Sequence, residues 1–600
     1  MSMKTIRERT QTLVDVAMGR APADLVIKGG QWVNVQSGEI IPAIDIAVVG
    51  ERIAFVGENA SHTVGDETEV IQAEGRYLVP GLLDAHMHIE SGMVTITEFV
   101  RAVGPHGTTG MFVDPHEIAN VFGLKGVRLM AEEAEKQPVH VWVQVPSCVP
   151  SAPGLETPGS SIGPEEVQEA MSWDRIIGLG EMMNFPGVFN SDRKMHDEMA
   201  ATRAAGKVVG GHYASPDLGL PFHGYAAGGP EDDHEGTRKE DALARVRQGM
   251  KAMLRYGSGW LDVEAQIKAV TEEGLDPRHF LLCTDDTHSE TLVNEGHMDR
   301  VVRHTIDLGV DPLTVIQMAT LNTAEHFGVA RDMGQIAPGR YADILLVPDL
   351  KDFIAETVIA KGQVIAENGT WAIDLPEVEY PRWATHSVNV KRPLTADDFR
   401  LEVPEELSGA ELEAHVIGVI EGQAPTKHLR VPVEAEGGEI KVDIGRDLAK
   451  IALVERHNAT GGVQVALVQG FELGPDCALA STVAHDSHHM IVVGTDEDQM
   501  ARAANELVDM QGGQVVVKED QIIGKVPLPI AGLMSDKRAE VVAEEAASVL
   551  EGFRECGCTI KNPNMQLSLL ALVVIPALRI SDLGLVDADA FKLIPAVEEV

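Results

Sequence analysis

The sequence predicts an α/β protein built on a (β/α)8 barrel of the TIM type, with a small composite β-sandwich domain and an additional C-terminal α+β domain. Three observations support this prediction. Eight strand-like apolar runs alternate with helical stretches within residues 77–334. Short strands with glycine turns lie on both sides of that region, and the pattern changes again after about residue 400.

The barrel prediction depends on the number and spacing of the apolar runs. Eight parallel strands, each followed by a helix, occupy roughly 250 residues in such barrels. Helical periodicity separates several of the runs here, for example in GLKGVRLMAEEAEKQ. A doubly wound open sheet is the alternative. The eight runs are LVPGLLDAHMH, GTTGMFVDPH, VHVWVQVPS, RIIGLGE, KVVGGHY, a short one ending in EDDHE, KAMLRYGS and HFLLCTDDTH.

The segments outside the barrel divide into four further parts. Residues 1–20 are expected to form an amphipathic helix. Residues 21–76 and 335–376 contain similar strand–Lys-Gly–strand segments, VIKGGQWV and VIAKGQVI, and are expected to build one small β-sandwich together. Residues 377–399 are rich in proline and charge, which predicts a linker, and residues 400–600 are expected to form the α+β domain.

Composition excludes several classes of protein and partner. The 600 residues contain 49 Lys and Arg against 92 Asp and Glu, a formal net charge of −43. Because so acidic a surface repels phosphate groups, we expect neither nucleic acid nor a membrane as partner. Five cysteines form no disulfide framework, and the charged N-terminus lacks the apolar run of a secretion signal. We therefore expect a cytoplasmic protein, and the appended domain favours a homo-oligomer such as a dimer.

Potential metal ligands occur where the predicted strands end. His86 and His88 alternate on one strand, so both imidazoles point to the same side and suit a divalent transition metal. In a barrel these strand ends share one rim, where barrel chemistry takes place. Four histidines and two carboxylates suffice for two metal ions about 3.5–4 Å apart that share a carboxylate and a water molecule. The candidates at later strand ends are Glu181, His212, His234 and Asp285.

The chain resembles the amidohydrolase superfamily and, within it, the bacterial adenine deaminases. The resemblance lies in LVPGLLDAHMHIESGMVTITEF, GTTGMFVDPHEIANV, GLGEMMNFPGV, DDHEGT and LCTDD, and in STVAHDSHHMIVVG of the C-terminal region. The superfamily motifs are moderately specific. The combination of DPHEIANV, GEMMNFPGV and AHDSH is specific to the deaminase group.

The resemblance implies hydrolytic deamination of adenine to hypoxanthine and ammonia by a hydroxide that bridges two divalent metal ions. Manganese or iron is expected, with zinc as the alternative. Many superfamily members bridge their metals with a carboxylated lysine, and the resemblance places Glu181 at that position here. The implied ligands are His86, His88 and Asp285 for the first metal and His212 and His234 for the second, with Glu181 shared.

Proton transfer and substrate recognition are implied for a few further residues. Asp285 would take the proton as hydroxide attacks, and either Asp285 itself or Glu117 as an assisting group would deliver a proton to the amino group. Adenine offers no phosphate or ribose, so hydrogen bonds to ring nitrogens and shape must select it. Asp114, His116 and Glu117 in DPHEIAN offer the donors and acceptors for this task. In the alternative interpretation, Asp114 caps the following turn and His116 only supports the site.

The C-terminal segment AHDSHH, residues 484–489, is a second polar cluster. On a strand, His485 would share one face with Ser487 and His489, while Asp486 and His488 would take the other. We interpret His485, Asp486 and His488 as additional active-site residues, with a surface turn as the alternative. The family motif ends in asparagine where this chain has His489.

Other functions fit part of this pattern. A binuclear amidohydrolase that acts on a different aminopurine or heterocycle, a cyclic amide or an N-acyl amino acid would keep every ligand. A purine-binding protein without catalysis would keep the pocket. A nucleic-acid base deaminase is excluded because its H-x-E…P-C-x-x-C zinc motif does not occur. The main departure from the family is GHYASPDLG, which places Tyr213 and Pro216 close to His212 and could reshape the pocket.

Overall fold

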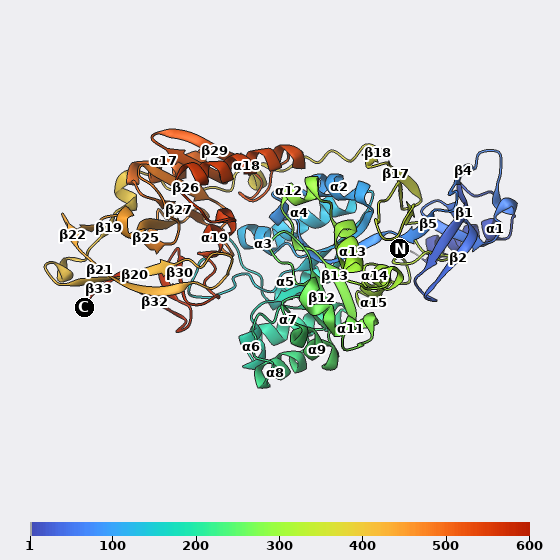
Figure 1. The fold of residues 1–600 in the computed structure, drawn as a ribbon, viewed down its shortest axis with the longest axis horizontal. Coiled ribbons are helices and arrows are strands. Elements are labelled where there is room, and N and C mark those ends of the chain that lie inside the picture. Colours follow the sequence, from blue (N-terminus) through green and yellow to red (C-terminus); the bar gives the residue numbers. More distant parts are fainter. Residues whose placement is uncertain (1–2) are drawn as a thin grey trace.

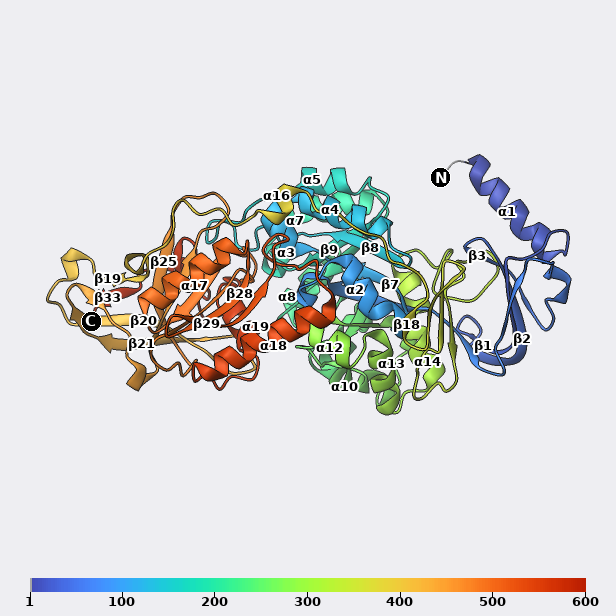
Figure 2. The ribbon, with the colours of Figure 1, turned by 90° about the horizontal axis from the view of Figure 1, so that it is seen from above.

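The computed structural model describes residues 3–600, and the molecule is elongated (Figure 1). A β-rich part with the N-terminal helix lies at one end, the barrel lies in the middle, and the C-terminal part lies at the other end (Figures 1 and 2). After the barrel the chain returns to the first part before it crosses to the C-terminal part.

Parallel strands in chain order form the centre of the molecule. One sheet has the order β10-β9-β8-β7-β6-β14, and a second has the order β11-β12-β13. The last strand, β14, pairs with the first, β6, which an open doubly wound sheet does not allow. The predicted parallel barrel is therefore confirmed in outline. The strands are β6 (Leu82–His88), β7 (Thr108–Val113), β8 (His140–Val145), β9 (Ile176–Met182), β10 (Val208–Gly211), β11 (Asp232–Asp233), β12 (Lys251–Arg255), β13 (Phe280–Cys283) and β14 (Asp285–Asp286).

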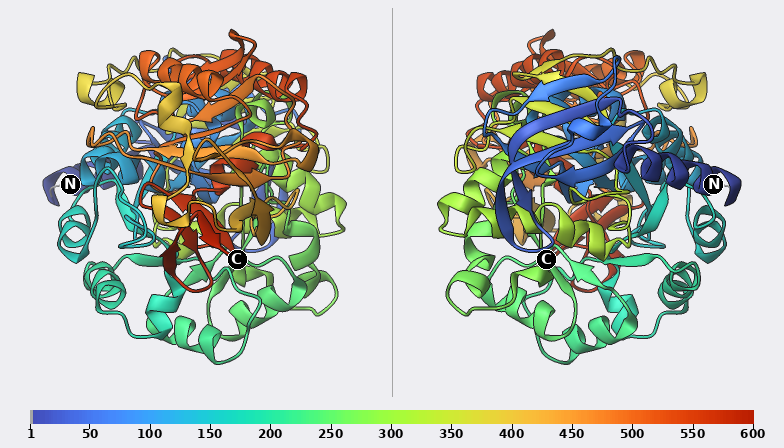
Figure 3. Two further views of the ribbon diagram at one scale, coloured as in Figure 1. Left: turned by 90° about the vertical axis from the view of Figure 1, so that its left-hand side faces the viewer. Right: turned by 90° about the vertical axis from the view of Figure 1, so that its right-hand side faces the viewer.

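Helices follow these strands and lie around the periphery of the barrel (Figure 3). Their starts follow ordinary capping rules: Asp192, for example, accepts hydrogen bonds from the amides of Lys194 and Met195 at the first turn of α7. The barrel helices include α2 (Ile96–Val103), α3 (His116–Phe122), α4 (Leu124–Glu135), α5 (Pro164–Ala170), α7 (Arg193–Ala204), α9 (Lys239–Arg247), α12 (Ser289–Asn294), α13 (Met298–Asp307) and α14 (Pro312–Met318).

Strands from both sides of the barrel segment share one sheet of nine strands, in the order β18-β17-β16-β15-β5-β1-β2-β3 with β4 beside β1. The prediction of the first barrel strand is wrong at its start, because Leu78 and Val79 belong to β5 and pair with β15. Helix α1 (Met3–Ala17) packs on this sheet through Val16, and residues 1–2 of the predicted helix lie outside the described residues. The strands are β1 (Leu25–Asn34), β2 (Glu39–Val49), β3 (Arg52–Gly57), β4 (Glu69–Gln72), β5 (Tyr77–Pro80), β15 (Ile344–Val347), β16 (Thr357–Ala360), β17 (Gln363–Glu367) and β18 (Thr370–Trp371).

The C-terminal part contains a second nine-stranded sheet, in the order β21-β20-β25-β24-β27-β26-β28-β29, with β33 (Val597–Glu599) beside β20. Three helices accompany it: α17 (Glu497–Asp509), α18 (Ala539–Glu555) and α19 (Pro563–Leu569). The other strands are β20 (Leu412–Gly418), β21 (Lys427–Val433), β24 (Ala449–Val454), β25 (Val463–Gln469), β26 (Cys477–Ser481), β27 (Met490–Gly494), β28 (Gly513–Lys518) and β29 (Gln521–Pro527).

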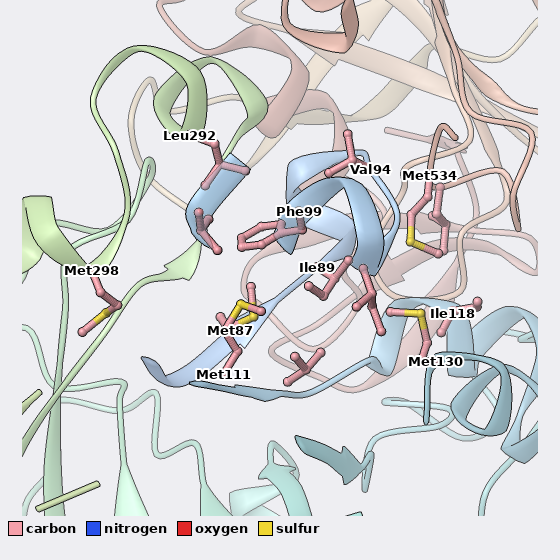
Figure 4. Packing of buried hydrophobic residues seen from close by; sticks show 14 of the residues in the cluster. Met87, Ile89, Val94, Phe99, Met111, Ile118, Met130, Leu292, Met298 and Met534 are labelled. Carbon is pink, nitrogen blue, oxygen red and sulfur yellow. The ribbon is translucent and has the colours of Figure 1, made fainter. Parts of the chain in front are cut away.

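A continuous apolar core joins the barrel to the C-terminal part. Met534, which follows β29, is buried in the same cluster as Ile118 of α3 and Met130 of α4 (Figure 4). The amide of Ser535 also donates a hydrogen bond of 2.9 Å to the carbonyl oxygen of Met93. Apolar burial of this kind stabilises an interface strongly, so the C-terminal part has a fixed position over the barrel. Within residues 3–600, no helix is long and apolar enough to cross a membrane.

Candidate metal centre

The end of β6 brings two imidazoles to the barrel rim. His86 and His88 are buried, and their ring centroids lie 4.9 Å apart. The Nδ1 atom of His88 lies 2.8 Å from the carbonyl oxygen of Asp114 and donates to it, which leaves Nε2 as the free ligand atom. The Nε2 atom of His86 is buried and has no hydrogen-bond partner among the described residues. An orphaned imidazole nitrogen of this kind fits a metal ligand.

Glu181, the residue before the end of β9, lies at the middle of the polar cluster. Its Oε1 atom is 3.2 Å from His88 Nε2 and 3.9 Å from His86 Nε2. Its Oε2 atom is 3.3 Å from His234 Nε2 and contacts His212 Nδ1. The two carboxylate oxygens therefore face different pairs of histidines, as a bridging ligand requires.

The ligand atoms form two groups that have Glu181 in common. One consists of His86, His88 and Glu181, and the other of Glu181, His212 and His234, and within each group all ligand atoms lie within 4.8 Å of one another. The rings of His86 and His234 stack at 4.0 Å, which places the two groups side by side. Nitrogen and carboxylate ligands in such groups fit two divalent ions.

Asp285 completes the cluster from the last barrel strand. Its Oδ1 atom lies 3.2 Å from His88 Nε2, and its Oδ2 atom accepts a hydrogen bond of 3.0 Å from Arg255 Nη1. Asp285 has a backbone φ of 59°, a left-handed conformation that aspartate tolerates better than most residues. Arg255 also contacts Glu235 and Asp262, so one buried guanidinium pairs with three carboxylates.

Burial and charge suit two of the ligands, His86 and Glu181, to metal binding. Burial holds the pKa of His86 well below its usual value, and the neighbouring histidines act in the same direction, so this imidazole is neutral as a ligand must be. Burial alone would raise the pKa of Glu181, but His212 and the other nearby histidines hold it well below its usual range. The carboxylate is therefore ionised.

The DPHEIAN residues have different positions around the cluster. Asp114 Oδ2 accepts a hydrogen bond of 2.8 Å from the amide of Glu181, and Gly180 makes room for it, since a Cβ there would lie 2.1 Å from that oxygen. His116 Nδ1 lies 3.4 Å from Glu181 Oε1. Glu117 faces a cavity, and burial raises its pKa to about 8. Asp114 does not cap α3, whose N-cap is Pro115.

The AHDSHH segment is a turn between β26 and β27, so the prediction of alternating strand faces is wrong. The strand ends at Ser481 and resumes at Met490, because the segment leaves the sheet to reach the barrel. Asp486 is buried with Oδ1 4.0 Å from His116 Nε2, and His485 lines the same cavity as Glu117. The surface-turn alternative is also wrong, since most of the segment is buried. His488 folds back, and its Nδ1 atom accepts from the amide of Ala484.

Comparison with known proteins agrees with this arrangement. Residues 77–221 and 237–365 match the model of the amidohydrolase family, and residues 423–592 match that of the adenine deaminase C-terminal domain. An adenine deaminase of Rhizobium meliloti is 60% identical over 97% of both chains. An adenine deaminase of Moorella thermoacetica is 49% identical over 99% of both chains. The chain belongs to the adenine deaminase family of amidohydrolases.

In this member of the adenine deaminase family, a cavity of about 320 Å³ lies between the barrel rim and the C-terminal part. The six predicted metal ligands do not line it, but Glu117 on its wall has Oε2 3.9 Å from His88 Nδ1. The barrel contributes Glu90, Ser91, Glu117 and His288, and the C-terminal part contributes His485. Asp114 and His116 do not line this cavity, so of the three DPHEIAN candidates only Glu117 reaches it. The C-terminal part is thus one wall of the pocket rather than a separate appendage. Its further lining residues include Gln514, Leu533, Ala543, Ala546, Ala547, Leu550 and Ser568.

Two features next to the site differ from what the sequence suggested. Tyr213 does not reshape the cavity: it is buried among Phe185, Phe222 and Tyr225, and its hydroxyl donates to the carbonyl oxygen of Asp217. Arg255, by contrast, was missed. The signal was an arginine at the end of the seventh apolar run, KAMLR, where a charged residue in a buried strand needs a partner.

Proposed function

We propose that this member of the adenine deaminase family hydrolyses adenine to hypoxanthine and ammonia in the cavity between the barrel rim and the C-terminal part. One observation carries the proposal: Glu181 is shared by two groups of histidines, with Asp285 beside them. Relatives named adenine deaminase that match 97–99% of the chain support the same substrate. The substrates are then adenine and water.

We infer that the site takes two divalent metal ions, manganese or iron, with zinc as the alternative. Bound there, they would lower the pKa of a water molecule so that hydroxide is available near neutral pH. His86, His88 and Asp285 would hold one ion, and His212 and His234 the other. Glu181 would hold both.

The chain's own residues would carry the protons. Arg255 donates to Oδ2 of Asp285 and holds the carboxylate in place, and this carboxylate would take a proton when the C–O bond to purine carbon 6 forms. Asp285 can return that proton to the exocyclic amino group, so that the C–N bond breaks with ammonia as leaving group. Glu117, on the cavity wall, would assist this transfer, and His485 and Asp486 would close the site from the C-terminal part, with His488 behind them.

The proposal extends to the organisation of the chain. We propose the division into a helix (1–20), a composite β-domain (21–76 with 335–376), a catalytic barrel (77–334), a linker (377–399) and a C-terminal α+β domain (400–600). A homodimer and a cytoplasmic location, without nucleic-acid or membrane partners, remain part of the same hypothesis and follow from charge and composition.

Metal analysis combined with an ammonia-release assay tests the proposal. Purified protein should contain two divalent ions per chain and release ammonia from adenine faster than from other aminopurines. Lactams and N-acyl amino acids serve as the control substrates, because they would be preferred by another binuclear amidohydrolase. Preference for a control substrate, or full activity without metal, would contradict the proposal.

A further inference from the structure

A buried amide in the cavity has no partner. Gln514 is 6% exposed and lines the cavity, yet its Oε1 atom accepts no hydrogen bond from any of residues 3–600. No hydrogen bond from its side-chain nitrogen occurs among the described residues either. A buried polar group without a partner costs about 1–3 kcal/mol, so a polar ligand is the natural partner for this amide.

The position of Gln514 is rigid. It lies on β28, where Ser481 of β26 and Val526 of β29 pair with it on the two sides. These strand pairs fix the backbone from which the amide projects, as a specific binding group requires. Part of the neighbouring wall is formed by small apolar side chains of α18, Ala543, Ala546 and Ala547.

The cavity therefore has two chemically different sides. Glu117 of α3 lies on the barrel side, next to the metal ligands, and Gln514 belongs to the C-terminal sheet. If the proposed reaction is correct, purine carbon 6 must face the barrel side. The opposite edge of the purine, which carries N3 and N9, then faces the C-terminal part.

We propose that Gln514 determines specificity by pairing with the N3/N9 edge of a free purine base. A primary amide offers one acceptor and one donor in a plane and pairs with two adjacent purine atoms of opposite type. N9–H would donate to Oε1, and Nε2 would donate to N3. In a nucleoside N9 carries the sugar and no hydrogen, so Gln514 would reject nucleosides. This inference rests on the proposed function for the orientation of the base.

Equilibrium binding tests the inference without turnover. Unsubstituted purine has no amino group to lose but keeps N3 and N9–H, and 9-methylpurine lacks the N9 hydrogen. Calorimetry on metal-replete wild-type protein should show purine bound at least about 30-fold more tightly than 9-methylpurine. In Gln514→Leu the ratio should fall to about threefold or less, and purine itself should bind about 30-fold more weakly. An unchanged ratio in Gln514→Leu, or no purine binding by the wild type, would overturn the inference.

Controls separate a binding role from a structural one. Because leucine removes an unpaired amide, Gln514→Leu should keep its metal content and have a thermal midpoint equal to or above that of the wild type. Gln469→Leu, on β25 of the same sheet but outside the cavity, should leave the binding ratio unchanged. Adenine turnover is measured in parallel. If adenine is turned over but Gln514→Leu binds purine and 9-methylpurine in the wild-type ratio, only this inference is contradicted. If the wild type discriminates between purine and 9-methylpurine but does not turn over adenine, only the proposed function is contradicted.

Discussion

The two walls of the cavity are built in different ways. On the barrel side, side chains from the ends of separate parallel strands converge, and charged groups such as Arg255 and Asp285 pair with one another. On the C-terminal side, Gln514 of β28 and His485 of the turn lie among apolar residues such as Leu533 and Ala543, and residues 561–568 add further polar groups. In this scheme the barrel wall binds the metal ions and transfers protons, and the C-terminal wall binds the purine base.

This difference has a physical origin. Parallel strands in a barrel end at one rim, so ligands at successive strand ends meet without any special loop. The mainly antiparallel C-terminal sheet has no such common rim, so it reaches the site through the turn at His485–His489 and through the side chain of Gln514 on β28. We expect substitutions on the barrel wall to remove turnover, and substitutions on the other wall to change affinity.

The largest effect should come from Glu181→Gln. An amide cannot bridge two cations with two anionic oxygens, so metal content after dialysis should fall below two ions per chain and turnover should fall by at least about 10³-fold. Glu133→Gln is the matched control: Glu133 is buried in the barrel too, but it bonds Thr97 and Tyr380 and should keep both ions. Near-normal turnover and metal content in Glu181→Gln would contradict the expectation that substitutions on the barrel wall remove turnover.

Asp285→Asn should come next. The amide keeps the size of the side chain but takes no proton, so kcat for ammonia release from adenine should fall by about 10²–10⁴-fold. The binding of purine should change little, because the base contacts in this scheme come from the opposite wall. Steady-state kinetics combined with calorimetry separate the two parameters. A variant with the wild-type rate would show that Asp285 is not the proton carrier.

The sequence predicted the barrel wall well because its pattern is local and repeated. Each ligand follows an apolar run, so chain order alone placed His86, Glu181, His212 and Asp285 at one rim. The C-terminal wall was harder to predict. Gln514 sits in GGQVVVK, an ordinary strand sequence, and only the packing of β28 over the barrel gives it a cavity to face. AHDSHH was recognised as unusual, but its polarity did not reveal that it forms a buried turn.

A smaller effect is expected from Arg456→Lys, which loosens the C-terminal wall. Arg456 is fully buried and donates to the carbonyl oxygens of His488, Ser387 and Ala531, so it fixes the turn that carries His485. A lysine satisfies fewer of these acceptors at once. KM for adenine should rise about 10-fold with kcat changed less than threefold and with both metal ions retained.

A matched control for Arg456→Lys is Arg52→Lys. Arg52 of β3 is also buried, but it bonds the carbonyl oxygen of Gly339 and the carboxylate of Asp332, and it does not line the cavity. Its replacement should lower the thermal midpoint without changing KM. If Arg456→Lys lowers kcat and leaves KM unchanged, the turn acts on the chemical step. The expectation that the C-terminal wall affects only affinity would then be wrong.

Glu198→Gln should affect stability alone. It allows a buried polar group outside the cavity to be compared with Gln514, which lines the cavity. Glu198 of α7 is buried, neither carboxylate oxygen has a hydrogen-bond partner in the described structure, and Lys194 Nζ lies 3.6 Å away. Burial raises its pKa to about 8, so the folded protein binds this proton more strongly than the unfolded chain does. Stability from this group is therefore present below about pH 4.5 and lost as the pH rises to about 8.

The glutamine variant does not lose that stability, so its thermal midpoint at pH 9 should exceed that of the wild type by about 2–4 °C, and the gap should close towards pH 5. Glu165→Gln, at an exposed site of α5, should show no gap at either pH. Turnover should stay within twofold of the wild type in both variants. The buried Glu198 carboxyl lines no cavity and affects only stability, whereas the buried amide of Gln514 lowers stability but can bind a ligand. A loss of purine discrimination in Glu198→Gln would remove that contrast.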